Sequence, residues 1–135
     1  MRLGKFAAIA VAAMTLSAAT TLKAHHSFAA EFDATKPVTL RGTLTRVELI
    51  NPHGWVHIDV KNPDGTVTSW AVEAGSTTQL LRQGLRKTDF KIGSEVVVKG
   101  FLARNEKPIA NGTTVSFSDG RDFFLSGERG ERGTP

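Results

Sequence analysis

The four histidines of this chain fall into two pairs, His25 with His26 and His53 with His57. Imidazole is a common protein ligand for copper, zinc and nickel. If a cut makes His25 the first residue, its α-amine and its ring together chelate one ion. A third nitrogen, from His53 or His57, would complete a planar arrangement suited to Cu(II). We therefore predict a copper site with His25, His26 and His53 as the leading metal ligands and His57 in reserve.

The spacing of the second pair limits such a site. Residues four apart on a regular strand face the same way and lie about 13 Å apart. His53 and His57 therefore do not share one ion unless the turn at Asn51-Pro52 bends His53 back, and the site needs His25 and His26 to reach across.

The acceptor for the other ring N–H of a ligand histidine is expected to be Asp59 or Asp33. The alternative is a structural role for each histidine. His25 and His26 would then be solvated, His53 would hydrogen-bond its turn, and His57 would lie half-exposed on its strand.

The stretch from Trp55 to Lys61 alternates as a strand. Its β-branched residues Val56, Ile58 and Val60 are predicted to face the core. This places Trp55, His57 and Asp59 together on the outer face, and we take these three as candidate ligand-binding residues. An exposed tryptophan stacks on a sugar, a base or a partner's side chain. The other reading is that Trp55 packs beneath Phe28 or Phe32 of the N-terminal arm.

Catalysis has little support in the sequence. Ser27 or Ser69 could be combined with His57 and Asp59 as a catalytic triad. However, neither serine lies at the sharp strand-to-helix turn that exposes a catalytic serine. We expect no catalytic residues and interpret the protein as a binding protein, not an enzyme.

The elements that position these residues are mainly strands. Residues 38–50 form a long first strand whose apolar parity flips after Leu44, as a β-bulge would produce. Asn62-Pro63-Asp64-Gly65 is a hairpin turn, and a strand with Trp70 and Val72 in the core follows at residues 66–74. Ser76 caps a short helix at residues 77–83, and Gly84 ends it.

Further strands are expected at residues 95–102, 113–117 and 122–125. A bulged first strand, a three-strand meander, a helix after strand three and then further strands is the order of the OB barrel. We predict an all-β fold with a small α content, an OB-like barrel of five to six strands; another small barrel or a sandwich is the alternative. The outer face of strands two and three and the loop holding His53 are the usual binding surface of that fold.

The chain begins like a secretory signal peptide, with Arg2 and Lys5 before a short apolar run. That run is too short to span a bilayer comfortably, so we expect export to the periplasm and no stable membrane span after cleavage. Cleavage after Ala19 and after Ala24 both fit local rules. We divide the chain into a signal peptide (1–24), an N-terminal arm (25–37), the barrel (38–125) and a disordered tail (126–135).

Charge and cysteine content limit the classes of partner that the protein can bind. The whole chain has 17 basic and 13 acidic residues, and residues 1–24 hold three of the basic ones, so the mature part has 14 against 13. A net charge near +1 gives no concentrated basic face, and we expect no nucleic-acid partner. Cysteine is absent, which excludes thiolate chemistry. The remaining partners are a transition-metal ion, an unidentified periplasmic protein or a small ligand.

The segments His25-His26-Ser27-Phe28 and Ile50-Asn51-Pro52-His53 together resemble a family of small exported bacterial proteins classed only as a domain of unknown function. The resemblance covers His25 to about Leu125. It implies an export signal directly before the paired histidines, and therefore favours cleavage after Ala24. It implies no activity, so the function expected from the residues is a copper-binding protein. The alternative is a metal-free accessory module that binds a partner protein or small ligand through the outer face of strands two and three.

Overall fold

The structure is a computed structural model that describes residues 27–126. Most of this region is strand and the helices are short, so the predicted all-β class is confirmed. In chain order the elements are α2 (Phe28–Glu31), β1 (Phe32–Glu48), β2 (Trp55–Lys61), β3 (Val67–Glu73), α3 (Thr77–Arg82), the 3-10 helix η1 (Lys87–Asp89), β4 (Glu95–Ala103), β5 (Ile109–Phe117) and β6 (Asp122–Phe124).

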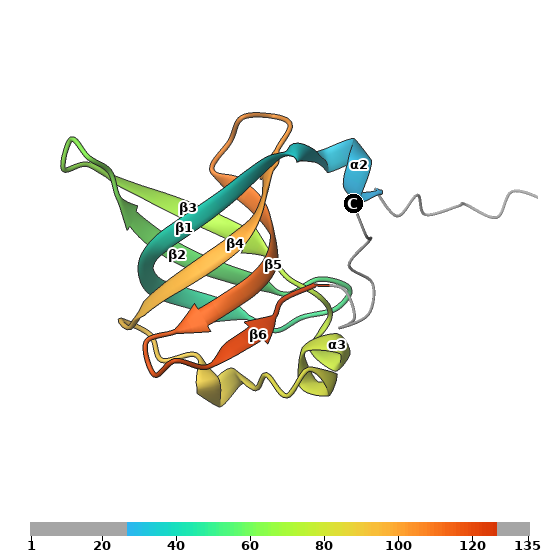
Figure 1. Cartoon of the computed structure of the whole chain (residues 1–135). Coiled ribbons are helices and arrows are strands. Elements are labelled where there is room, and N and C mark those ends of the chain that lie inside the picture. The colour runs from blue at the N-terminus through green and yellow to red at the C-terminus, as the bar shows by residue number, and fades with distance from the viewer. Residues whose placement is uncertain (1–26, 127–135) are drawn as a thin grey trace, which may run out of the picture.

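The sheet closes on itself (Figure 1). Its order is β3-β2-β1-β4-β5-β6, and a further pairing joins β3 to β5. That pairing is parallel, whereas the others are antiparallel. The ring therefore runs β1-β2-β3-β5-β4 and returns to β1, with β6 as an addition to β5. With α3 following β3, this arrangement confirms the OB-like prediction.

β1 is long because it serves both sides of the ring. Its first part pairs with β4 and its last part with β2. The register with β2 shifts between Leu44 and Arg46, which is the predicted bulge. The bulge bends the strand and exchanges its faces: Leu40 and Leu44 are buried before it, and Val47 packs against the core after it.

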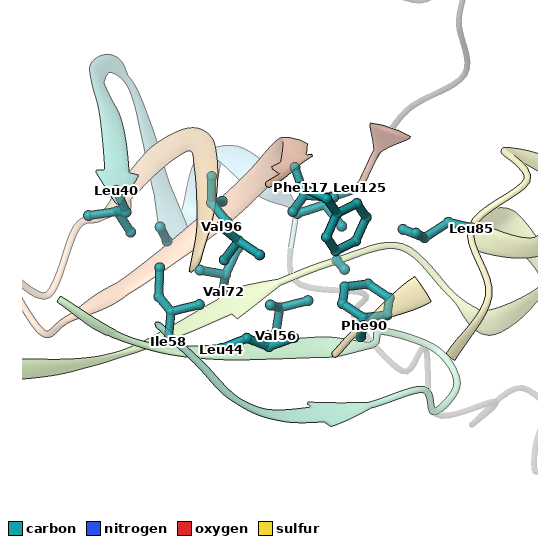
Figure 2. Packing of buried hydrophobic residues seen from close by; sticks show 14 of the residues in the cluster. Leu40, Leu44, Val56, Ile58, Val72, Leu85, Phe90, Val96, Phe117 and Leu125 are labelled. Carbon is teal, nitrogen blue, oxygen red and sulfur yellow. The ribbon is translucent and has the colours of Figure 1, made fainter. Parts of the chain in front are cut away.

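The core fills the ring (Figure 2). Val56, Ile58 and Val72 are fully buried, as predicted, and Val60 and Trp70 pack against them partly buried. Burying each such aliphatic side chain contributes about 1.5–3 kcal/mol. The alternation that places these residues inward necessarily places Trp55, His57 and Asp59 outward.

α3 closes part of the ring in the predicted manner. Ser76 caps it, accepting a hydrogen bond from the Gln79 backbone N–H at 3.2 Å, while the Gln79 side chain accepts one from the Ser76 N–H at 3.1 Å. Gly84 follows with φ +83°, a conformation that favours glycine. Leu80 and Leu85 are buried, whereas Leu81 is 54% exposed.

One end of the core is aromatic and lies at η1 and β6, the elements at the bottom of Figure 1. The ring of Phe117 meets those of Phe90 and Phe123 edge-on, with centroids 5.4 Å and 5.8 Å away. Arg121 lies over Phe117 and Phe123 and pairs with Asp89 at 2.7 Å. We interpret this aromatic end as structural, because its rings contact one another and Arg121 pairs with Asp89.

Two boundaries differ from the sequence-based expectation by more than two residues. β1 begins at Phe32, inside the predicted arm, because Phe32 is buried and pairs with Ala103 of β4. β5 begins at Ile109, not at residue 113, because residues 109–111 pair with β3. Gly112 therefore lies within the strand. A Cβ there would come within 2.6 Å of Val72 and 2.7 Å of Leu125, so glycine serves close packing here.

Three predictions fall partly or wholly outside the described residues: the signal peptide, the paired His25 and His26, and nearly all of the tail. Within residues 27–126, no helix is long and apolar enough to cross a membrane.

Candidate functional site

The turn that carries His53 is fixed to the end of β3. The Gly54 N–H donates to the Gly75 carbonyl at 2.9 Å, and the Ala74 N–H donates to the Gly54 carbonyl at 2.8 Å. A Cβ on Gly54 would lie 3.2 Å from that Gly75 oxygen and 3.1 Å from the Glu48 carbonyl oxygen. The close approach therefore favours glycine, and it holds His53 beside β3.

The neighbour of His53 is Glu73, the last residue of β3. His53 Nδ1 lies 3.3 Å from Glu73 Oε1, with the imidazole 51% exposed and the carboxylate only 12% exposed. Burial raises the pKa of the Glu73 carboxyl above its usual value; the charge of His53 lowers it and that of Glu31 raises it. A carboxylate facing Nδ1 favours the tautomer that leaves Nε2 as the metal-binding nitrogen.

His53 and Glu73 adjoin a cleft. It has a volume of about 380 Å³, and Glu73 and Trp55 form one side of it. Its other lining residues come from α2, the start of β1, the end of β4, the β4–β5 loop and the start of β5: Ala30, Glu31, Phe32, Ala103, Arg104, Asn105 and Ile109. The cleft combines two aromatic side chains, two carboxylates and one guanidinium, next to an exposed imidazole.

α2 is held over this cleft mainly by Arg104. The Arg104 N–H donates to the Glu31 carbonyl at 2.8 Å, and its Nε donates to the Ala29 carbonyl at 2.8 Å. Its Nη1 also lies 3.7 Å from Asp33 Oδ2. These contacts fix the segment that directly follows His25 and His26 in the sequence.

Trp55 is half-buried at the cleft and is not covered by Phe28. Phe28 instead meets Phe32 and Phe101, each at a centroid distance of 5.7 Å. The arm therefore docks on β4 and leaves Trp55 as part of the cleft wall together with Phe32.

His57 has a different environment. Its Nε2 lies 2.8 Å from Glu48 Oε2 and 3.1 Å from Arg46 Nη2. The hydrogen bond from His57 lowers the pKa of the Glu48 carboxyl, and the charges of Arg46 and His57 add to this effect. Whichever tautomer is present, Nε2 is engaged: it donates to Glu48 or accepts from Arg46. The outward position of His57 is as predicted, but its Nε2 is already in use.

Neither predicted acceptor for a ligand histidine contacts His53 or His57. Asp59 accepts a hydrogen bond from Ser69 Oγ at 2.6 Å, and Asp33 accepts from the Thr35 hydroxyl at 2.7 Å. The carboxylates that face histidines are instead Glu73 and Glu48. The triad drawn on paper is not assembled either, because Ser69 bonds Asp59 whereas His57 bonds Glu48.

His53 and His57 have different carboxylate partners, Glu73 and Glu48. Between Ser27 and Ser126, no group of three or more histidines, aspartates and glutamates is arranged to hold a metal ion. His25 and His26 lie outside the described residues, so the predicted four-histidine set is untested as a set. Glu73 was missed although a sequence signal existed: counting back from the turn at residues 62–65 places it opposite Trp55.

Comparison with known proteins places the chain in a family. A family model described as a family of unknown function (DUF6152) matches residues 12–113. The match covers most of the chain, and the chain therefore belongs to this family. No curated protein and no solved structure matches it.

Proposed function

We propose that this member of the DUF6152 family of unknown function is an exported, periplasmic copper-binding protein. Its Cu(II) site combines His53 with His25 and His26, and cleavage after Ala24 frees the His25 amine. The observation that carries the proposal is the contact of His53 Nδ1 with the largely buried Glu73 carboxylate, which leaves Nε2 on an exposed ring. This is the outer-shell arrangement typical of metal-ligating histidines.

The position of α2 supports the proposal. The described chain starts at Ser27, and Ala30 and Glu31 of α2 line the cleft beside Glu73. The site requires His25 and His26 to reach His53, and two residues of extended chain span at most roughly 7 Å. Arg104 holds the segment that follows Ser27.

The donor set suits copper. An amine and three imidazoles are nitrogen donors, and nitrogen donors in a planar arrangement favour Cu(II) over the other divalent metals. His57 is left out of this set because its side chain is only 21% exposed, against 51% for His53, and lies beside the Arg46 guanidinium, which would repel a metal cation.

The test has two steps, both on protein exported by cells. Mass spectrometry of the mature N-terminus should find a chain beginning at His25; a chain beginning at Thr20 removes the amine chelate. Calorimetric titration with Cu(II) should then give one tight site in wild type and none in a variant with His25, His26 and His53 changed to alanine. His57→Ala is the matched control. Equal, weak binding by wild type and the triple variant would overturn the proposal.

A further inference from the structure

The β2–β3 hairpin exposes an open edge of the sheet. β3 pairs with β5 only over Ala71 to Glu73, and the hairpin projects from the barrel at the left of Figure 1. The Ala71 N–H donates to the Pro108 carbonyl at 3.0 Å, away from β2. Because this direction alternates along an antiparallel strand, the N–H and C=O groups of Val67 and Ser69 point to the same side. Among residues 27–126, β3 has no strand neighbour on that side at these two residues.

A groove lies beside this edge. It has a volume of about 550 Å³, which is within the usual range for ligand sites. Its apolar lining is Trp70, Ala71, Pro108 and Ile109, and its polar lining is Thr45, Arg46, His57, Ser69 and Lys107. The residues that end the open edge, Ser69 and Trp70, therefore also form one wall of the groove.

The groove is complementary to a negative charge. None of its lining residues is acidic. Arg46 lies 3.5 Å from Glu48, which is outside the lining. Within residues 27–126 the Lys107 ammonium has no carboxylate partner. An anionic group placed in the groove would gain a charge-assisted hydrogen bond from Lys107.

We propose that this edge and groove bind an extended acidic peptide segment of a partner protein. The peptide adds a strand to β3 through Val67 and Ser69 and places an aspartate or glutamate side chain beside Lys107. Only a polypeptide uses both features, because main-chain hydrogen bonds come from the edge and side-chain selectivity comes from the groove. This function is independent of the proposed copper site, which lies at the other cleft.

The probe is a blocked pentapeptide, Thr-Val-Glu-Val-Thr, compared with the same peptide carrying lysine in place of glutamate. In nitrogen-15 NMR titrations of the mature protein, the acidic peptide should shift the amide signals of Val67, Ser69 and Lys107. It should bind about tenfold more tightly than the lysine peptide, the difference expected from one charge-assisted hydrogen bond.

Two variants separate the groove from the edge. Lys107→Glu should reverse the preference between the peptides, and Lys87→Glu, on exposed η1, should leave it unchanged. Ser69→Pro removes an N–H that points away from β2, so no hydrogen bond to β2 is lost, and proline is tolerated at such edge positions. This variant should bind both peptides more weakly. Ser69→Ala controls for the hydroxyl that bonds Asp59.

Equal affinity for both peptides would overturn the proposal. So would shifts confined to β6, or no shifts with either peptide at millimolar concentration. Native amide dispersion in each variant shows that a lost signal reflects binding and not unfolding.

Discussion

The outer face of the barrel carries two histidine–carboxylate pairs that differ in which ring nitrogen is used. In the pair of His57 and Glu48, Nε2 contacts the carboxylate at 2.8 Å and the side chain of Arg46 as well. In the pair of His53 and Glu73, it is Nδ1 that lies 3.3 Å from the carboxylate. The His57 side chain is 21% exposed and lies beside a guanidinium, whereas the His53 side chain is 51% exposed and its carboxylate lies near Nδ1, not Nε2.

The surroundings of the two pairs sharpen this difference. Glu48 accepts a hydrogen bond from His57 and lies beside the Arg46 guanidinium, so its negative charge is stabilised. Glu73 is largely buried and near Glu31, so its negative charge is disfavoured. A cation bound beside Glu73 would relieve that penalty, whereas one beside Glu48 would compete with Arg46. The same residue types thus serve structure in one place and are suited to binding in the other.

The largest expected effect separates the two histidines directly. His53→Ala should weaken Cu(II) binding by more than about 100-fold, beyond the usual range for outer-shell changes. His57→Ala should leave the affinity within about twofold, because its nitrogen is not a ligand. Competition titration against a chelator of known affinity measures both. Equal losses in the two variants would erase the distinction between the pairs.

A smaller effect is expected from the carboxylates. Glu73→Gln should weaken Cu(II) binding by about 10- to 100-fold, because it removes the charge that orients and polarises His53. Glu48→Gln is the matched control and should leave the affinity unchanged. The same competition titration measures both variants. A loss of Cu(II) affinity in Glu48→Gln alone would place the site at His57 and contradict the account.

α2 provides a third test, since it covers only the His53 side. Arg104→Ala removes the hydrogen bond from Nε to the Ala29 carbonyl and should cost about 1 kcal/mol of unfolding free energy. Amide exchange at Ala30 should rise, and Cu(II) affinity should fall modestly. Exchange on β2 around His57 should stay as in wild type; a uniform rise over the whole barrel would show that α2 is not a separate unit.

The smallest effect is the pH dependence of the metal-free protein, where the two carboxylates have opposite signs. The Glu48 pKa is lowered by folding, so its contribution to stability is present above the unfolded pKa and is lost as pH falls through the folded pKa. The Glu73 pKa is raised, so its contribution is present at low pH and is lost as pH rises through the folded pKa. Carbon-13 NMR titration of the glutamate carboxyls should find them on opposite sides of the ordinary value. A shared midpoint would remove the electrostatic difference between the pairs.

Local chemistry predicted much of this fold. β2 has the predicted bounds because its β-branched residues alternate without interruption and a strong turn follows at residues 62–65. The bulge near Thr45 was visible as a change of apolar parity. The start of β1 was not visible, because the Phe32 pairing with Ala103 is followed by a register shift before Pro37 that hides any alternation.

The candidate site was predicted in part. The sequence placed His53 in a loop and Trp55 and His57 outward, because alternation determines faces. It did not identify the partners of the histidines, because Glu73 is brought to His53 by the clamp between Gly54 and Gly75. Counting from the turn at residues 62–65 places Glu73 opposite Trp55, but it does not reach His53, which lies in the turn before β2.

The most direct test of the copper assignment is pulsed EPR of the mature protein with one equivalent of Cu(II), counting imidazole nitrogens by their remote-nitrogen modulation. The account predicts identical spectra for wild type and His57→Ala, and the loss of one imidazole in His53→Ala. A spectrum that changes in His57→Ala and stays unchanged in His53→Ala would contradict it.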